Sequence, residues 1–354
     1  MHCSKFWPRG GASGILHHYT ETLTAFEFTS DTGTPQPNSV LFVGGLGDGL
    51  ATTEYLADVA AALKQTSWSI FSVTLSSAYQ GWGFGHLDRD TDEIARCVQY
   101  IRDYKKEKFG EDCDKVVLMG HSTGSQCVLH YLSRPNPHTT KPAFDPFLEH
   151  VERPVVNGAI MQAPVSDREA VQWVIKMGFL GRTPVELGAT YDRLVAMARA
   201  ALRRDDSTDT MLPISLTSQF GYPSNTPVSC RRFLSLVSPD SPNSPSEDDL
   251  FSSDLPDERH AKTFGAIRQG GLLQDRELLV FTSGADASIP DWVDKEFQLS
   301  RWQRAADAGG KPIWNPKSCV IPNASHALSN DDQAEPRRIL IEKVLAYLGT
   351  PSSA

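Results

Sequence analysis

The stretch that decides the fold is residues 115–132, KVVLMGHSTGSQCVLHYL. Its first part is a continuous aliphatic run, typical of a strand buried on both faces of a parallel sheet. Its last part has a helical pattern, and the glycine-flanked serine of GHSTG lies between the two. A GxSxG string alone is a weak motif, but a serine on a sharp strand-to-helix turn is a specific one, the nucleophile elbow. The sequence therefore predicts that Ser122 is a nucleophile, with the N-terminus of the following helix directed at developing negative charge.

A serine hydroxyl needs a general base, itself oriented by an acid, to attack a carbonyl carbon. His326 follows the last strand candidate in SCVIPNASHALSND, at the carboxyl end of a strand, where open α/β sheets bind their ligands. The acid is expected just beyond the preceding strand, where ELLVFTSGADASIPDWV offers Asp286 and Asp291. Asp286 follows the strand directly, whereas the start of a helix explains Asp291. We therefore predict a catalytic triad of Ser122, Asp286 and His326, in the chain order of α/β-hydrolases.

Stabilising a tetrahedral intermediate requires two preorganised backbone N–H donors. One is the amide that follows the nucleophile, Thr123. The other comes from the loop after an early strand, which here reads GGLGDGL at 44–50 and whose glycines let the backbone approach a substrate closely. By position this second donor is the Leu46 amide. A phosphate-binding loop is the rival interpretation, but GGLGDG has the spacing of neither GxGxxG nor the P-loop.

Short aliphatic runs alternate with helical patterns over most of the chain, which predicts an α/β fold with a mostly parallel central sheet and helices on both faces. Strands are expected at 24–30, 39–43, 69–75, 115–120, 158–162, 277–283 and 317–321, and helices at 52–65, 90–108, 122–132, 168–177, 184–203, 291–306 and 335–348. The alternation stops between 167 and 266, which we interpret as a cap inserted into a discontinuous core of residues 1–166 and 267–354. Within it, the Ser/Pro/Asp-rich segment 238–258 is expected to be a solvated loop, too polar to form core.

Composition narrows the partners and the compartment. A net charge of -9 and a pI near 5.6 argue against nucleic acid, whose phosphates need a basic surface. No apolar run reaches the length of a membrane span, and the N-terminus lacks a signal-peptide core. The six cysteines have no paired spacing, as in a reducing compartment. We expect a cytoplasmic protein with no membrane partner and no cofactor. His17 and His18 have no further ligand at metal-binding spacing, so no metal is expected either.

The motifs together resemble one family. VGGLGDG, GHSTG, SGADASIPDW, PNASHALS and the FLSL…DDLFSSDL stretch of the cap are similar to a fungal α/β-hydrolase family that includes intracellular siderophore ester hydrolases. The resemblance runs from about residue 15 to the C-terminus. It implies hydrolysis of the ester bonds of fusarinine-type hydroxamate siderophores, with release of iron that belongs to the substrate. It also implies the roles of Ser122, Asp286 and His326. Many relatives have His-Gly in the oxyanion turn, where this chain has Gly44-Gly45.

Two other functions stay open from the sequence. One is a general carboxylesterase, lipase or thioesterase acting on small acyl esters, and the other is a siderophore-binding relative without activity. Substrate contacts are expected from Gly45 and Asp48 in the oxyanion turn, from Trp82, and from Asp88 and Asp90. Fusarinine C has free amines, so the three carboxylates would favour it over its acetylated derivative.

Overall fold

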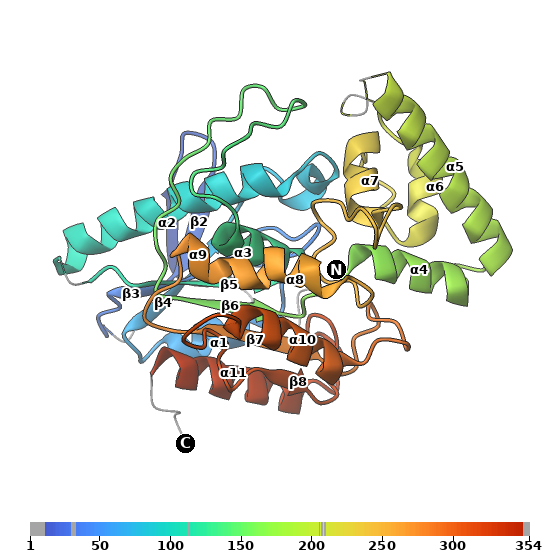
Figure 1. Cartoon of the computed structure of the whole chain (residues 1–354). Helices are drawn as coiled ribbons and strands as arrows, with labels where there is room; N and C mark the ends of the chain where they lie inside the picture. The colour runs from blue at the N-terminus through green and yellow to red at the C-terminus, as the bar shows by residue number, and fades with distance from the viewer. Residues whose placement is uncertain are drawn as a thin grey trace.

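The computed structural model describes residues 11–29, 33–111, 113–204, 206, 208 and 210–349. One eight-stranded sheet forms its centre, with the strand order β1-β2-β4-β3-β5-β6-β7-β8. Strands from β4 to β8 along this order are parallel, and β1 and β2 are antiparallel additions at one edge (Figure 1). The strands are β1 Gly14–His18, β2 Thr24–Phe28, β3 Asn38–Val43, β4 Trp68–Val73, β5 Val116–His121, β6 Gly158–Gln162, β7 Leu278–Ser283 and β8 Cys319–Ile321. The predicted fold class is confirmed.

Helices cover both faces of the sheet because the central strands are apolar on both sides. In β5, Val116 and Leu118 pack into the core with α2 (Leu87–Phe109), α3 (Thr123–Ser133) and α10 (Lys295–Asp307). Val117 and Met119 point the other way, into a core with α1 (Leu56–Leu63) and α11 (Ala334–Leu348). This alternation of successive side chains explains why the strand reads as one unbroken aliphatic run.

Strand β1 was not predicted from the sequence. Four of its five residues are exposed, and only His17 is buried. An edge strand with no apolar alternation gives no period-two signal. Backbone hydrogen bonds to β2, rather than a side-chain pattern, make this segment a strand.

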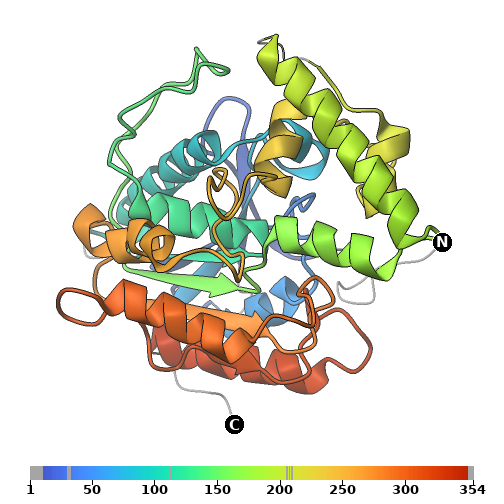
Figure 2. The same ribbon diagram turned by 45° about the vertical axis from the view of Figure 1, so that its right-hand side comes forward.

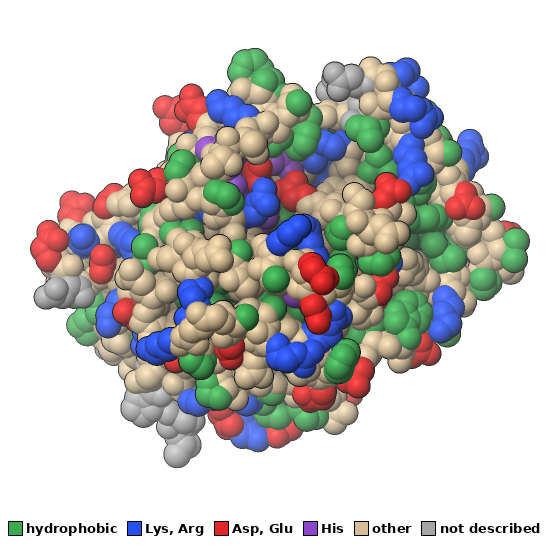
Figure 3. Space-filling view, in the orientation of Figure 1, with side chains coloured by type: hydrophobic (Ala, Val, Ile, Leu, Met, Phe, Trp, Pro, Cys, Tyr) green, Lys and Arg blue, Asp and Glu red, His purple; other side chains and the backbone are tan. Residues whose placement is uncertain are grey.

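Residues 167–237 form a separate layer over one end of the sheet (Figure 2). It contains α4 Asp167–Met177, α5 Pro184–Arg203, α6 Ile214–Thr217, the 3-10 turn η2 Ser218–Phe220 and α7 Cys230–Val237. These elements share a small apolar core of their own. Arginine side chains gather along its outer edge over α5, beside exposed apolar side chains (Figure 3). The division into core and cap at 167–266 stays a prediction.

Segment 238–258 is a loop up to Asp257, as predicted, but the expectation that it is solvated and too polar to form core was wrong. Asp248, Asp249 and Phe251 are buried, and Arg232 of α7 forms a doubly hydrogen-bonded ion pair with Asp248 at 2.6 and 2.7 Å. Phe251 lies in the main core, where its ring is 5.4 Å from that of Trp302. Pairing with arginine and serine side chains allows these acidic residues to be buried, which composition alone cannot reveal. The segment ends in the first turn of the short helix α8 Asp257–Lys262, which the turn η3 Phe264–Ala266 joins to α9 Ile267–Gly270.

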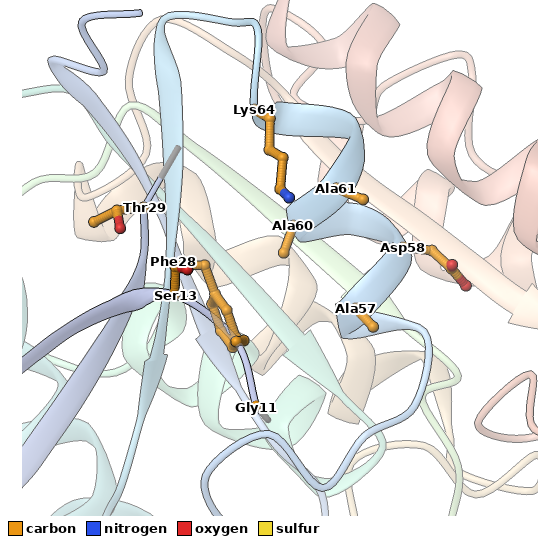
Figure 4. Close-up of a pocket in the computed structure, with 10 residues that line it drawn as sticks. Gly11, Ser13, Phe28, Thr29, Ala57, Asp58, Ala60, Ala61 and Lys64 are labelled. Atoms are coloured by element: carbon orange, nitrogen blue, oxygen red, sulfur yellow. The ribbon is translucent and has the colours of Figure 1, made fainter. Parts of the chain in front are cut away.

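A cavity of about 330 Å³ lies between α1 and the β1–β2 edge (Figure 4). Its lining combines small side chains with Asp58 and Lys64, and it includes Ser13 but no histidine. It therefore offers no rival serine–histidine pair. In the described part of the chain no helix is long and apolar enough to cross a membrane. Five of the cysteines are free thiols, and Cys3 lies outside the described residues.

Candidate active site

Ser122 occupies the sharp turn between β5 and α3. Its backbone has φ +55° and ψ −121°, a strained conformation for a residue with a side chain. The two motif glycines make this turn possible. A Cβ on Gly120 would lie 2.2 Å from the Gly124 carbonyl oxygen, and a Cβ on Gly124 would lie 2.3 Å from the Val43 carbonyl oxygen. The turn is thus packed too closely for any side chain at either position, and this holds the Ser122 hydroxyl at the end of the sheet.

The three predicted triad side chains come together. His326, on the loop after β8, has Nε2 2.8 Å from Ser122 Oγ and Nδ1 2.7 Å from the Asp286 carboxylate. Asp286 lies just after β7 with its side chain fully buried, and its other oxygen accepts the Ser288 N–H at 2.9 Å. Burial opposes the protonation of His326, but the hydrogen bond and charge of Asp286 outweigh it and raise the pKa of His326 above 6.5. The arrangement suits a base that takes the hydroxyl proton and is stabilised once charged.

Asp291, the rival acid, is exposed and lies before α10, and its carboxylate faces Lys176 at 3.4 Å. It is not the first-turn residue of a helix, as the sequence suggested, because the helix begins at Lys295 with Asp294 as its N-cap.

The turn at 44–49 lies directly against the nucleophile, because a Cβ on Gly45 would be 2.8 Å from Ser122 Cβ. Asp48 shapes this turn from inside. One carboxylate oxygen accepts the Gly45 N–H at 2.8 Å and the Thr53 hydroxyl at 3.0 Å, and the other accepts the Thr52 hydroxyl at 2.7 Å. Asp48 therefore holds the turn rather than facing a ligand.

Two backbone amides remain as candidates for the oxyanion hole. The Gly45 N–H is committed to Asp48, which leaves the Leu46 N–H as the next donor of the turn. Thr123 is the first residue of α3, where an N–H has no partner within the helix. The positions of both amides agree with the predicted pair, whose role stays a proposal.

His121 and Gln162 belong to the site and were missed. His121 Nδ1 bonds Gln162 Oε1, and Gln162 Nε2 in turn donates to the Ser283 hydroxyl and to the His326 carbonyl oxygen at 3.2 and 3.3 Å. Burial, followed by the proximity of His326, lowers the pKa of His121 to about 4. This chain of bonds ties the backbone of the base to β6. Gln162 ends a central strand, so the rule that ligand sites gather at carboxyl ends could have identified it.

Two predicted substrate contacts, Asp88 and Asp90, lie elsewhere. Asp88 bonds His130 Nε2 at 2.7 Å, in the last turn of α3, and Asp90 is buried near Cys127. At 1.5 Å per residue, His130 is ~12 Å along the helix from Ser122. These predictions were wrong because the first turn of α2 points its carboxylates at the far half of α3. The hypothesis that Asp48, Asp88 and Asp90 favour a substrate with free amines therefore has no support in the structure.

Trp82 packs between the oxyanion turn and the inserted layer. Its side chain lies in the apolar core of that layer, with Nε1 3.6 Å from where a Cβ of Gly47 would be. Only 2% of the residue is exposed, so Trp82 offers almost no surface to a ligand and instead supports the turn.

A serine on an elbow, a histidine and an aspartate in hydrogen-bond sequence, and a parallel sheet that carries all three at its carboxyl ends define an α/β-hydrolase fold. A solved "Alpha/Beta hydrolase fold protein of unknown function" has this fold, with a TM-score of 0.54 over 96% of this chain and 95% of that chain and an identity of 13%. At that identity the likeness concerns the fold alone.

The chain belongs to the family described as "Protein of unknown function (DUF1749)", whose model matches residues 4–349. It is 65% identical to "Fusarinine C esterase sidJ" of Aspergillus fumigatus, over 98% of both chains. It is 48% identical to "Esterase AN6793" of Emericella nidulans, over 96% of this chain and 93% of the relative. The solved "Siderophore hydrolase EstB from Aspergillus fumigatus" has a TM-score of 0.87 and 61% identity, over 97% of this chain and 98% of that chain. The family resemblance inferred from the motifs is confirmed.

Proposed function

We propose that the protein is a serine ester hydrolase. The observation that carries the proposal is the continuous series of hydrogen bonds from Ser122 Oγ through the His326 ring to Asp286, with distances of 2.8 and 2.7 Å. In an α/β-hydrolase scaffold this series activates a hydroxyl that is otherwise a weak nucleophile.

The reaction proceeds in two halves. As Ser122 Oγ bonds to the ester carbonyl carbon, His326 Nε2 accepts its proton, and Asp286 stabilises the imidazolium. The Leu46 and Thr123 amides donate to the oxyanion. The carbon–oxygen bond to the alcohol then breaks, and His326 returns the proton to that oxygen. Water, deprotonated by His326, then attacks the acyl-enzyme carbonyl carbon. The bond from that carbon to Ser122 Oγ breaks, His326 returns the proton to Oγ, and the acid leaves.

We propose ester bonds of fusarinine-type hydroxamate siderophores as the substrate. The support is similarity along nearly the whole chain to a fusarinine C esterase and to a siderophore hydrolase. Iron remains a part of the substrate, and its release inside the cell would follow from cleavage of the chelator. No step of this mechanism uses an ion held by the protein.

The test is incubation of the purified protein with ferric fusarinine C and separately with p-nitrophenyl esters of rising chain length. Mass spectrometry should show monomeric fusarinine units from the wild type and none from Ser122→Ala. Ser133→Ala, at the other end of α3, serves as the matched control and should remain active. Cleavage of aryl esters alone would indicate a general esterase, and tight binding of ferric fusarinine C without cleavage would indicate a binding protein. Either result would contradict the proposed substrate chemistry.

A further inference from the structure

We propose that Asp88, His130 and His138 form a binding site for a divalent transition metal ion of the zinc class, at the end of α3 remote from Ser122. The three residues come from separate segments. Asp88 is in the first turn of α2, His130 in the last turn of α3, and His138 on the connection from α3 to β6. One ligand atom from each lies within 4.8 Å of the other two. Imidazole nitrogen and carboxylate oxygen are the donors that Zn²⁺ accepts in proteins.

The distances between these atoms are close to those of a coordination shell. Tetrahedral bonds of ~2.0–2.1 Å to zinc place neighbouring ligand atoms roughly 3.4 Å apart. His138 Nδ1 is 3.4 Å from Asp88 Oδ1. His130 Nε2 is 2.7 Å from the same oxygen, which is a hydrogen-bond distance. Binding an ion would move that hydrogen to His130 Nδ1 and open the pair by ~0.7 Å.

The hydrogen bonds of Thr91 show why a cation is favoured here. Its hydroxyl oxygen lies 2.9 Å from the Leu87 carbonyl oxygen and 3.0 Å from the Asp88 carbonyl oxygen. Both carbonyl oxygens are acceptors, so the one hydroxyl hydrogen is donated to them. Thr91 Oγ1 must then accept from His138 Nε2, which is 3.1 Å away. In the neutral imidazole the lone pair is consequently on Nδ1, facing the Asp88 carboxylate. Two acceptors that face each other are stabilised by a cation between them.

The surroundings of the three residues add a fourth possible ligand atom and a helix C-terminus that favours positive charge. Glu247 Oε1 lies 3.9 Å from His130 Nε2, and within the described residues it is a buried oxygen without a hydrogen-bond partner. The last turn of α3 also presents the negative end of its helix dipole. A cavity of about 270 Å³ reaches Asp88, His130 and Glu247. Arg134, Arg259 and Lys262 line it too, so the negative charge of Asp88 must offset their repulsion of an ion.

A second group shares one ligand with the first. Asp92, His138 and His150 also bring one ligand atom each within 4.8 Å. There, however, His150 Nδ1 bonds Asp92 at 2.8 Å, and its Nε2 lies 3.0 Å from the Thr140 carbonyl oxygen, which requires a hydrogen on Nε2. The tautomer of His150 is thus the same as that of His138, and the two pairs differ in distance. The 2.8 Å between His150 and Asp92 is a hydrogen-bond distance, already closed by a proton, whereas the 3.4 Å between His138 and Asp88 matches the spacing of two ligands of one ion. We therefore assign the site to the Asp88 group.

The test is titration of the chelator-treated full-length protein with Zn²⁺ by calorimetry, and with Co²⁺ by visible absorption, which reports tetrahedral coordination. The wild type should bind one equivalent. His130→Gln should weaken Zn²⁺ binding by more than about 100-fold, and Thr91→Val, which removes an outer partner of His138, by about 10- to 100-fold. The matched control His150→Gln should leave the affinity unchanged within about threefold.

Circular dichroism and ester hydrolysis of each variant verify the fold, and Asp88→Asn replaces His130→Gln should the latter be unfolded. Failure of the wild type to bind one equivalent would overturn the proposal. So would loss of binding in His150→Gln with retention in His130→Gln, which would place the ion in the second group. The result is independent of the proposed esterase activity, which requires no metal.

Discussion

A hydroxyl, an imidazole and a carboxylate lie together at each end of α3, but their hydrogen bonds suit different chemistry at the two ends. At its N-terminus, both ring nitrogens of His326 are engaged, one by the Ser122 hydroxyl and one by Asp286. At its C-terminus, the arrangement around Thr91 directs a lone pair of His138 toward Asp88. On the two proposals above, the first end moves a proton and the second binds a cation.

In both places the hydrogen-bond partner of one ring nitrogen determines what the other nitrogen of the imidazole can do. A carboxylate on Nδ1 prepares His326 for the proposed role of base toward the hydroxyl at Nε2. A hydroxyl oxygen that accepts from Nε2 of His138 makes its Nδ1 a ligand. The helix dipole has the matching sign at both ends, positive beside the developing oxyanion and negative beside the proposed ion.

The greatest loss of activity is expected from a substitution that affects only the N-terminal end of α3. Asp286→Asn should lower kcat by ~10⁴-fold, because an amide favours the wrong imidazole tautomer and cannot stabilise the imidazolium. Steady-state kinetics on a soluble ester would measure the effect, and Zn²⁺ affinity should not change. Asp291→Asn is the matched control, since that residue is exposed, and it should keep wild-type kcat. A comparable loss in the control would make Asp291 the acid.

A smaller effect is expected from the oxyanion turn. Asp48→Asn replaces an oxygen that accepts hydrogen bonds with an NH₂ group that faces donors, so the turn at 44–49 should shift. Loss of one well-placed oxyanion donor costs ~10²–10³ in rate, and a displaced donor should cost about 10- to 100-fold in kcat with little change in KM. A change confined to KM would instead mean that Asp48 contacts the substrate.

The dependence of kcat/KM on pH tests the proposed role of His326. His326 must be neutral to act as a base, and its pKa is raised, so kcat/KM should increase with pH along a limb whose midpoint lies above 6.5. Asp286→Asn should move that midpoint down. The same shift stabilises the folded protein below pH 6.5, and this contribution disappears as the pH rises through the folded-state pKa of His326. A limb below pH 6.5 in the wild type would contradict the assignment.

The smallest effect concerns the other end of α3. Zn²⁺ at about 100 times its dissociation constant should stabilise the protein by ~2.7 kcal/mol, seen as a rise in Tm of a few degrees in calorimetry. Ester hydrolysis at 25 °C should be the same with and without the ion. A change in kcat on chelation would show that the two ends are coupled through α3.

Much of this site could be predicted from the sequence, because strand, turn and helix signals lie next to Ser122, Asp286 and His326 in the chain. The elbow glycines exclude side chains for steric reasons, and such constraints appear directly in a motif. The Asp88 site could not be predicted, since its ligands come from three distant segments with no metal-binding spacing. The burial of Asp248 could not be predicted either. It depends on the ion pair with Arg232, and the polarity of the segment does not reveal that partner.

The buried pair of Arg232 and Asp248 bears on protein engineering. Arg232 also donates to the Trp82 carbonyl oxygen at 3.0 Å, and the Ser229 amide donates to the Gly83 carbonyl oxygen at 3.0 Å. Trimming residues 167–248 to obtain a minimal hydrolase would leave those carbonyls unpaired and uncover Trp82 beside the oxyanion turn. The inserted layer is therefore a poor candidate for modular exchange.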